Sequence, residues 1–185
     1  GPQKVINQLI NAGVDIIKLK AGRSLEDIYS NIELISTYLE INSTGDKLIE
    51  SIRAQKQNLN QLIKSLDYEP NLLFILGHGG VARVAGKNTA ADSIIELSGA
   101  KNVVEDFSGY KPVSPEQFVL FDPDFILTTS MGIDAKGGID KFSKMPGIRD
   151  TAAVKNGNIL IFDAQYLLGF GPRTVQALLE LNKNY

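Results

Sequence analysis

The sequence predicts an α/β fold: a three-layer lobe with a mostly parallel sheet and helices on both faces, preceded by a long helix. Two observations support this prediction. From residue 72 onward, short apolar runs typical of buried strands alternate with segments of helical period. Before that point, apolar residues recur at helical spacing for about six turns.

The N-terminus predicts one helix followed by one strand. Apolar residues at helical spacing between Val5 and Ile10 predict a helix, which Gly13 ends. Residues 14–19 are largely apolar and predict a short buried strand. We therefore expect an αβ unit at this end of the chain.

Two helices are expected next. Ser24, followed three positions later by Asp27, predicts a capped helix start, and one apolar stripe continues from there to about Ile41. After a turn expected at residues 42–45, the apolar positions of residues 46–66 predict a long helix. Its remaining surface is mostly Lys, Gln, Asn and Glu, so we expect it to pack on one side only.

The remainder predicts strands that alternate with helices, which implies a mostly parallel sheet. A boundary is expected near residues 66–71, because Pro70 ends the region before the lobe. A glycine-rich loop is expected after the first strand. Strands are expected at 72–77, 124–129 and 158–163, an extended segment at 101–105, and helices at 89–98, 114–121, 138–145 and 172–183.

Composition excludes several classes of function. The 185 residues carry 19 basic and 21 acidic side chains, so no basic excess attracts nucleic acid. There is no cysteine and one histidine, which excludes disulfides and thiolate metal sites and makes an all-protein zinc site improbable. No apolar run approaches the roughly 20 residues of a membrane span. We expect no direct membrane insertion, and any export signal to be removed or upstream.

Gly77-His78-Gly79-Gly80-Val81-Ala82 follows a predicted strand and is similar to a dinucleotide-binding fingerprint, G-x-G-x-x-A. The match is partial, because the best helix start, at Thr89, comes seven residues after Ala82. A nucleotide-dependent, Rossmann-like enzyme therefore stays as an alternative of another class. The other interpretation is a glycine loop at the C-terminal end of a strand, where open α/β sheets bind ligands.

His78 is the single histidine of the chain. At a strand end it is a candidate metal ligand or hydrogen-bond donor, although a lone histidine there more often satisfies local backbone groups. No second histidine or paired carboxylate accompanies it in the sequence, so no residue is available to act with His78 as the other group of a general acid–base pair. We expect a protein that is not an enzyme.

The loop from Asp163 to Thr174 is the most distinctive stretch. Arg173 is predicted at the start of the last helix, where the helix dipole disfavours a cation. Such an arginine indicates an anionic partner, for example a ligand carboxylate, and an exposed arginine without a partner is the alternative. Glycines on both sides of Phe170 are expected to present its aromatic ring.

Five stretches, in this order and spacing, resemble one family: His78-Gly79-Gly80, residues 85–92, residues 109–114, Pro146-Gly147-Ile148 and residues 168–173. They are similar to the C-terminal half of periplasmic haem-binding proteins of ABC-type haem importers, members of the class III, cobalamin- and siderophore-type solute-binding proteins. The resemblance covers the whole chain. It divides the chain into a remnant of the N-terminal lobe (1–42), an interlobe helix (43–69) and the C-terminal lobe (70–185).

The resemblance implies that haem is held in a cleft between two lobes, with no catalytic cofactor, and is delivered to a membrane permease for iron uptake. Arg173 is expected to pair with a haem propionate. Glu116 resembles a surface carboxylate with which relatives dock on permease arginines, and it also suits the first turn of a helix. The expected wall of the cleft comprises His78, Gly79, Gly80, Arg83, Tyr166, Phe170 and Gly171.

This sequence departs from the family pattern in the residue that binds the haem iron. The family's axial ligand, usually a tyrosine, belongs to the N-terminal lobe, most of which we expect to be missing here. Tyr110, Tyr166 and His78 are the substitute candidates, and Tyr110 lies in a Tyr-Lys-Pro turn that suggests a structural role. Residues 170–173 favour haem over cobalamin or an iron-siderophore, which stay as alternatives. The expected location is extracytoplasmic: the periplasm, or lipid-anchored at the cell surface where no outer membrane exists.

Overall fold

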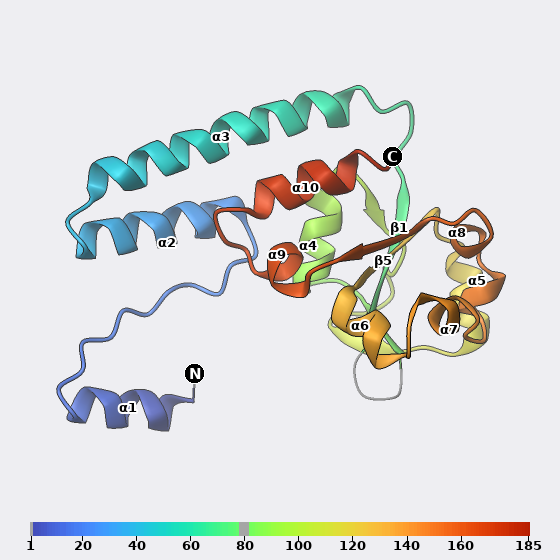
Figure 1. The fold of residues 1–185 in the computed structure, drawn as a ribbon, viewed down its shortest axis with the longest axis horizontal. Coiled ribbons are helices and arrows are strands. Elements are labelled where there is room, and N and C mark those ends of the chain that lie inside the picture. Colours follow the sequence, from blue (N-terminus) through green and yellow to red (C-terminus); the bar gives the residue numbers. More distant parts are fainter. Residues whose placement is uncertain (1, 78–81) are drawn as a thin grey trace.

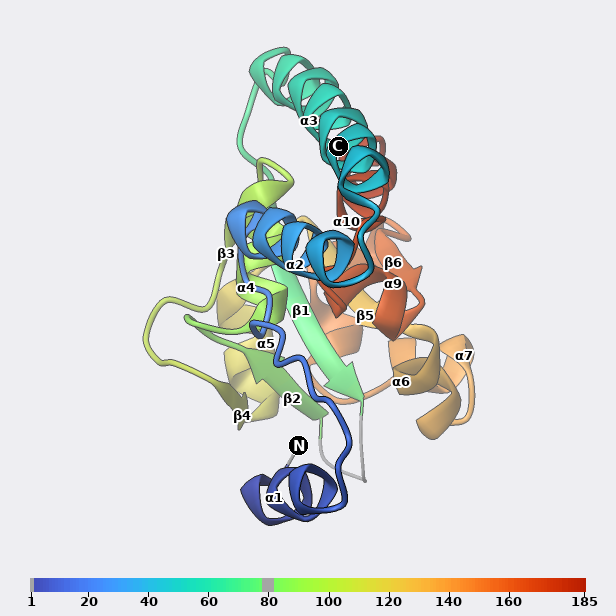
Figure 2. The ribbon, with the colours of Figure 1, turned by 90° about the vertical axis from the view of Figure 1, so that its left-hand side faces the viewer.

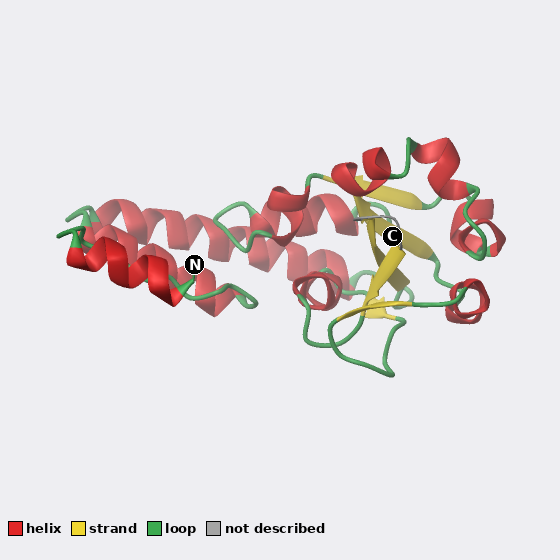
Figure 3. Ribbon diagram, turned by 90° about the horizontal axis from the view of Figure 1, so that it is seen from below, coloured by secondary structure: helices red, strands yellow, loops and turns green. Residues whose placement is uncertain are grey.

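The computed structural model describes residues 2–77 and 82–185. A sheet lobe lies at one end of the molecule, two long helices extend from it, and the N-terminal segment runs beneath them (Figure 1). Seen from below, the helices project well beyond the sheet (Figure 3). Among the described residues, no helix is both long enough and apolar enough to cross a membrane.

The N-terminal segment contains one helix, α1 (Gln3–Asn11), as predicted, and Gly13 follows it with φ +77°. The strand predicted at residues 14–19 is wrong, because these residues form no strand. A strand needs a neighbour for its N–H and C=O groups, and no described strand pairs with this segment. Instead, the backbone of Lys20 exchanges two hydrogen bonds with the Asn31 side chain, at 2.9 and 3.0 Å.

Two antiparallel helices follow, α2 (Leu25–Tyr38) and α3 (Asn42–Lys64). The predicted cap is confirmed, since Ser24 Oγ accepts the N–H of Asp27 at 3.1 Å. The turn predicted at residues 42–45 is wrong: it lies at residues 39–41, where Glu40 has φ +57°, and residues 42–45 form the first turn of α3. Gly45 is buried against Ser36, and the missing side chain lets the two helices approach closely.

The sheet has the order β4-β2-β1-β5-β6, with β3 also beside β1. β1, β3, β5 and β6 run parallel, and β2 pairs antiparallel with β1 on one side and with β4 on the other, which confirms a mostly parallel sheet (Figure 2). The register places Leu73 opposite Ile126. The strands are β1 (Asn71–Gly77), β2 (Ala82–Ala85), β3 (Lys101–Asn102), β4 (Tyr110–Pro112), β5 (Phe125–Thr129) and β6 (Ile159–Phe162).

The lobe contains more short elements than predicted. The strands β2 and β4 were not expected, because neither carries the apolar run that marks a central strand. The extended segment 101–105 shortens to the two residues of β3. The helices are α4 (Ala90–Leu97), α5 (Pro115–Phe121), α6 (Ser130–Ala135), α7 (Ile139–Ser143), α8 (Ala152–Lys155), α9 (Ala164–Leu168) and α10 (Thr174–Asn182), with a 3-10 turn, η1 (Ile148–Asp150). Among these, α6, α8 and α9 were not predicted.

Helices cover both faces of the sheet, as predicted. Successive residues of β1 alternate, so Leu72 and Phe74 belong to a core that includes residues of α2, α3, α4, α9 and α10, whereas Leu73 and Ile75 belong to a core that includes residues of α5 to α8. All four side chains are 0 % exposed. Burying one such side chain contributes about 1.5–3 kcal/mol, so these two cores hold the carboxyl edge of the sheet in place.

Candidate functional site

The carboxyl ends of β1, β5 and β6 lie side by side at one end of the strands, here called the carboxyl edge of the sheet, because these strands are parallel. Open α/β sheets bind ligands outside this edge. β1 ends at Gly77, in tight contact with Gly132 of α6, and β6 leads through Asp163 into α9. Loops after β1 and β6 therefore lie along the same edge, separated by the width of β5.

The loop from β6 to α10 forms a small polar pocket of about 220 Å³. Asp163 Oδ1 accepts the N–H of Tyr166 at 2.8 Å and thereby starts α9, and the N–H of Thr174 donates to Gly171 O at 3.0 Å before α10. The pocket is lined by Gln165, Tyr166, Gly169, Gly171, Pro172, Arg173 and Thr174. Three of these, Arg173, Tyr166 and Gly171, are residues that the sequence predicted for the ligand site.

Arg173 is exposed and lies against Tyr166, with 5.5 Å between its guanidinium carbon and the centre of the ring. It makes no ion pair with any described residue. α10 begins at Thr174, two residues later than the predicted start at Pro172, so Arg173 occupies the N-cap position. The pocket therefore carries an available positive charge at a helix start, where the dipole adds to the attraction of an anion.

The ring of Tyr166 forms a cation–π contact with Arg173. Its hydroxyl donates a hydrogen bond to Glu180 Oε1 at 2.8 Å. Burial, and then the Glu180 carboxylate, raise the pKa of Tyr166 to about 12, so the phenol is neutral at physiological pH. An iron-ligating tyrosine must lose its proton, so this environment disfavours Tyr166 as an axial ligand and favours a positioning role.

Phe170 is placed differently from the prediction of a presented ring. It is 4 % exposed, has φ +44°, and packs in the core below α2. Gly22 lies directly against it, and a side chain there would come within 2.5 Å of Phe170 Cβ. The flanking glycines bend the backbone as expected, but the ring turns inward because an exposed phenyl group loses its burial free energy. Phe170 supports the loop instead of facing outward.

An apolar hollow of about 280 Å³ adjoins the polar pocket. The two share Gly169, Gly171 and Pro172, so the loop separates them. The hollow is lined by α2 residues, including Ile32 and Ile35, by Leu19, Lys20 and Gly22 of the N-terminal segment, and by Phe170. A polar, positively charged pocket beside an apolar hollow suits a ligand that carries a carboxylate on an apolar body.

The loop after β1 is less fully described. His78, Gly79 and Gly80 lie outside the described residues. Arg83 is exposed on β2, opposite Leu76 near the carboxyl end of β1. Because β2 and β6 are separated by β1 and β5, Arg83 lies about 14 Å from the strand that leads to Tyr166, at ~4.8 Å per strand.

The dinucleotide fingerprint lacks its structural context. A pyrophosphate site needs a helix that begins within the motif, whereas Ala82 begins strand β2 and the next helix, α4, begins at Ala90. Thr89 caps α4 by accepting the N–H of Asp92 at 3.0 Å, which confirms the helix start predicted there. The structure therefore gives no support to the nucleotide-dependent alternative.

The other metal candidate among the described residues, Tyr110, is partly buried and packs against the core. Its ring packs edge-on against Phe74, with 6.3 Å between centroids, and burial raises the pKa of Tyr110. Within the described residues there is no group of three or more His, Asp or Glu side chains arranged to hold a metal ion. Residues 110–112 form strand β4 and not the turn predicted there, and the packing of the Tyr110 ring indicates a structural role.

Glu116 is exposed in the first turn of α5, whose start is a complete capping box of Ser114 and Gln117. Hydrogen bonds from Ser114 and from its own N–H lower the pKa of Glu116, so it is charged at neutral pH. η1 packs beside α5 through Gly147, which lies against Pro115. This carboxylate is therefore held on a defined surface formed by α5 and η1.

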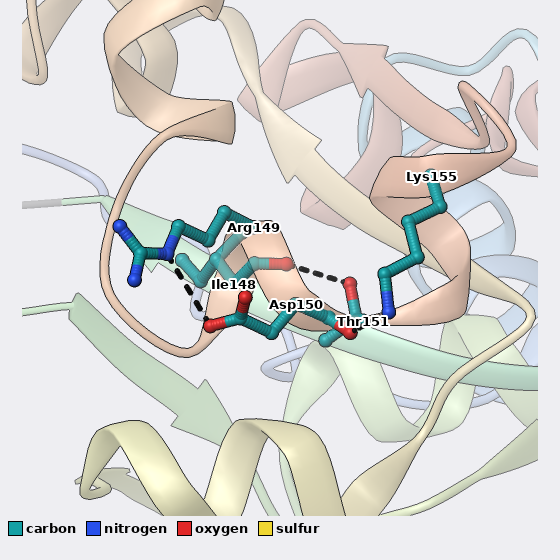
Figure 4. Close-up of polar contacts among 5 residues, drawn as sticks. All are labelled: Ile148, Arg149, Asp150, Thr151 and Lys155. Carbon is teal, nitrogen blue, oxygen red and sulfur yellow. Dashed lines mark hydrogen bonds and ion pairs between the residues drawn. The ribbon is translucent and has the colours of Figure 1, made fainter.

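Local polar contacts fix η1 (Figure 4). Thr151 Oγ1 donates to Ile148 O at 2.7 Å, Lys155 Nζ donates to Asp150 O at 2.7 Å, and the exposed Arg149 pairs with Asp150 at 3.4 Å. This surface therefore presents both signs of charge on a fixed backbone.

The sequence did not predict Thr174 as a lining residue of the polar pocket, nor Glu180, which lies outside the lining and accepts the hydrogen bond of Tyr166. Glu180 lies fourteen positions after its partner Tyr166, and no pattern links them before α9 and α10 are packed together. Thr174 follows Arg173 as an ordinary first-turn residue, and its burial depends on the same packing. Neither carries a sequence signal by itself.

Comparisons with known proteins place the chain. The family model described as "Periplasmic binding protein" matches residues 4–166. The structure superposes on the periplasmic haem-binding protein RhuT from Roseiflexus sp. RS-1 with a TM-score of 0.93 and 34 % identity, covering 100 % of this chain and 71 % of that one.

Curated relatives are more distant. An uncharacterised ABC transporter substrate-binding lipoprotein, YvrC of Bacillus subtilis, is 25 % identical over 95 % of this chain and 55 % of its own length. A vitamin B12-binding protein of Vibrio parahaemolyticus is 24 % identical over 100 % of this chain and 64 % of its own length. The chain thus spans less than two thirds of these relatives. They and RhuT are binding proteins and not enzymes, and the chain belongs to the periplasmic binding protein family.

Proposed function

We propose that this protein binds haem in a cleft between two lobes and delivers it to the permease of an ABC transporter. The observation that carries the proposal is Arg173, an exposed cation without a carboxylate partner among the described residues, fixed beside an apolar hollow. Haem combines an apolar ring with carboxylates at one edge. A guanidinium group can grip a carboxylate through two hydrogen bonds.

The relatives add support for haem. RhuT, named as haem-binding, matches the whole of this chain. A second haem-binding protein, BhuT, is described as holding two haems, and its similarity also extends over all of this chain. In this proposal, Arg173 and Gly171 contact the ligand, residues 78–83 form a second part of the wall, and Phe170 and Tyr166 support the loop.

The domain division belongs to the proposal as well. Residues 1–42 would belong to an N-terminal lobe, residues 43–69 would carry the interlobe helix, and residues 70–185 would form the C-terminal lobe. The unburied N-terminal segment supports this division, because every residue from 2 to 24 retains solvent exposure. The axial iron ligand would come from the N-terminal lobe, since Tyr110 and Tyr166 are both engaged elsewhere.

Hemin titration tests the proposal, monitored through the Soret band, in a form of the protein with a complete N-terminal lobe. Arg173→Ala is expected to weaken binding roughly 10- to 100-fold, since it removes a charge-assisted contact. Arg53→Ala is the matched control: Arg53 lies 5.2 Å from the Tyr29 ring, in a similar cation–π contact away from the pocket. Failure of the two-lobe protein to bind hemin, or equal effects of both variants, would contradict the proposal.

Cobalamin is the second candidate ligand, because curated relatives are vitamin B12-binding proteins at 24–27 % identity. A parallel titration with cyanocobalamin discriminates the two. Saturable binding of cyanocobalamin without binding of hemin would replace haem by a corrinoid. Binding of a ferric siderophore alone would replace it by an iron chelate.

Delivery to a permease would use Glu116, at an extracytoplasmic location in the periplasm or on a lipid anchor, as the lipoprotein relative suggests. Glu116→Lys is expected to leave hemin affinity unchanged and to reduce haem-dependent ATP hydrolysis by the reconstituted transporter several-fold, by placing a cation against permease arginines. Glu50→Lys, at an exposed position of α3, is the control. Equal activity of both variants would exclude this role for Glu116.

A further inference from the structure

α6 occupies the middle of the carboxyl edge of the sheet. It begins at Ser130, directly after β5, and it contacts both β1 and β6 (Figure 1). The strand register places Thr129, the last residue of β5, opposite Phe162, the last residue of β6. The first turn of α6 therefore lies between the loop that follows β1 and the loop that follows β6 and carries Arg173.

The backbone of this turn is fixed. Thr129 Oγ1 accepts the N–H of Gly132 at 3.1 Å and caps α6. Gly132 is buried against Gly77 at the end of β1, where a side chain on Gly77 would come within 2.5 Å of Gly132 O. Ile133 is 6 % exposed and belongs to one of the two cores of the lobe. The turn therefore holds its exposed side chains at a set position beside the three strand ends.

Met131, in this turn, is 61 % exposed. A solvated apolar side chain is ordinary by itself. The position of Met131, directly after the carboxyl end of a central strand, is where open α/β sheets bind ligands. In the lobe as far as the structure describes it, the other exposed large apolar side chains lie on α5, on α7 or within β6: Val119, Leu120, Ile139 and Ile161.

A ligand that contacts both expected walls of the cleft must pass over this turn. Arg173 follows β6, whereas Arg83 lies on β2, and three strand intervals at ~4.8 Å each separate β2 from β6. β5 is one of the two strands between them. A methionine side chain is unbranched and polarisable, and its sulfur makes favourable contacts with aromatic rings. An exposed thioether at this position therefore suits a flat, conjugated ring.

We propose that Met131 is the floor of the ligand site, where its thioether contacts the ring of the bound ligand while Arg173 binds a carboxylate at one side. The inference rests on the proposed function for the walls of the cleft and for haem as the ligand. It adds a residue that recognises the apolar ring of the ligand and not its charged groups.

Hemin titration of the two-lobe protein tests this contact. Met131→Ser is expected to weaken hemin binding about tenfold, because burial of an apolar side chain of this size contributes on that order. Met131→Leu keeps the apolar volume and is expected to retain most of the affinity. Met145→Leu is the matched control, because Met145 is the other methionine of the chain and packs against a core. Equal affinities of wild type and Met131→Ser would overturn the inference.

Thermal unfolding identifies an indirect effect. Met131 is exposed, so Met131→Ser is expected to leave the Tm of the ligand-free protein unchanged. A clear fall in Tm together with weaker hemin binding by both Met131→Ser and Met131→Leu would identify Met131 as a residue that supports the fold, and would contradict the contact.

Oxidation supplies a readout that a solvated side chain outside the site would not move. Hydrogen peroxide transfers one oxygen atom to an exposed thioether and leaves water, and the resulting sulfoxide is polar. The two-lobe protein is treated with peroxide, freed of it and then titrated with hemin. Its affinity is expected to fall about as far as in Met131→Ser, whereas Met131→Leu treated in the same way is expected to lose less. Equal losses in the two proteins would contradict the contact.

Methionine methyl signals in NMR separate this inference from the haem assignment. The Met131 signal of the two-lobe protein is identified as the one that Met131→Leu removes. Zinc protoporphyrin, a diamagnetic porphyrin, is expected to shift this signal and to leave that of Met145 unchanged. A shift of the Met131 signal by cyanocobalamin, without hemin binding, would retain the floor and reject haem. Hemin binding without a shift of the Met131 signal by the porphyrin would retain haem and reject the floor.

Discussion

The N-terminal segment and the sheet lobe use similar apolar residues with opposite results. α1 carries Val5, Leu9 and Ile10 at helical spacing, and these side chains are 43–54 % exposed. In the lobe, α10 has comparable spacing and buries Val175, Leu178 and Leu181 completely. The comparison shows that periodicity predicts a helix, whereas burial requires a second surface on which the apolar stripe packs.

The largest effect is expected when a buried and an exposed apolar side chain are each replaced by alanine. Phe74→Ala is expected to lower the free energy of unfolding by about 3–5 kcal/mol, because Phe74 is 0 % exposed inside the sheet core. Leu9→Ala, at a side chain that is 43 % exposed, is expected to change it by less than ~0.5 kcal/mol. Urea denaturation of the 185-residue protein measures both. A large effect of Leu9→Ala would mean that α1 packs on the lobe in solution.

A smaller effect is expected from two helix caps of the same type. Thr89 is 4 % exposed, and its hydroxyl accepts from Asp92 and donates to Gly86 O at 3.0 Å, so Thr89→Ala is expected to cost about 2 kcal/mol. Ser24 caps α2 at a half-buried position, and Ser24→Ala is expected to cost about 1 kcal/mol or less. Equal costs would show that burial adds nothing to a cap in this chain.

The smallest effect concerns alkaline pH at the polar pocket. The folded pKa of Tyr166, about 12, lies above its ordinary value of 10.0, so the unfolded chain loses this proton first. Stability from this group is present below about pH 10 and decreases as the pH rises toward 12. Tyr166→Phe is expected to flatten this part of the curve of Tm against pH. Tyr38→Phe, at an exposed tyrosine, is the control variant.

The sequence predicted the long elements of the fold well. Continuous apolar strands such as β1 and β5 and capped helices such as α2 and α4 depend on local patterns, and all four were placed within two or three residues. The strand at residues 14–19 failed because an apolar run forms a strand only beside a partner. β2 and β4 were missed because both are short and neither carries a continuous apolar run: β2 includes Arg83, and the edge strand β4 includes Lys111 and Pro112.

The site divides in the same way. Arg173 was predicted from one local conflict, a cation at a helix start, and the structure places it on the pocket. Phe170 was expected to point outward. Its inward orientation depends on the space left by Gly22, which lies almost 150 positions earlier in the sequence. The contacts of Glu180 and Thr174 likewise form only when α9 and α10 pack together. Pairings between distant segments are the part that local patterns leave open.

The two edges of the sheet differ in how readily they would add a foreign strand. β4 is protected, because it has three residues, Lys111 carries a charge, and Pro112 has no N–H to offer. β6 pairs only with β5 among the described strands, and its residues Ile159–Phe162 are all apolar, with Ile161 43 % exposed. Aggregation of concentrated or partly unfolded protein is therefore expected to begin at β6, and a lysine at Ile161 would be the first change to try for a more soluble lobe.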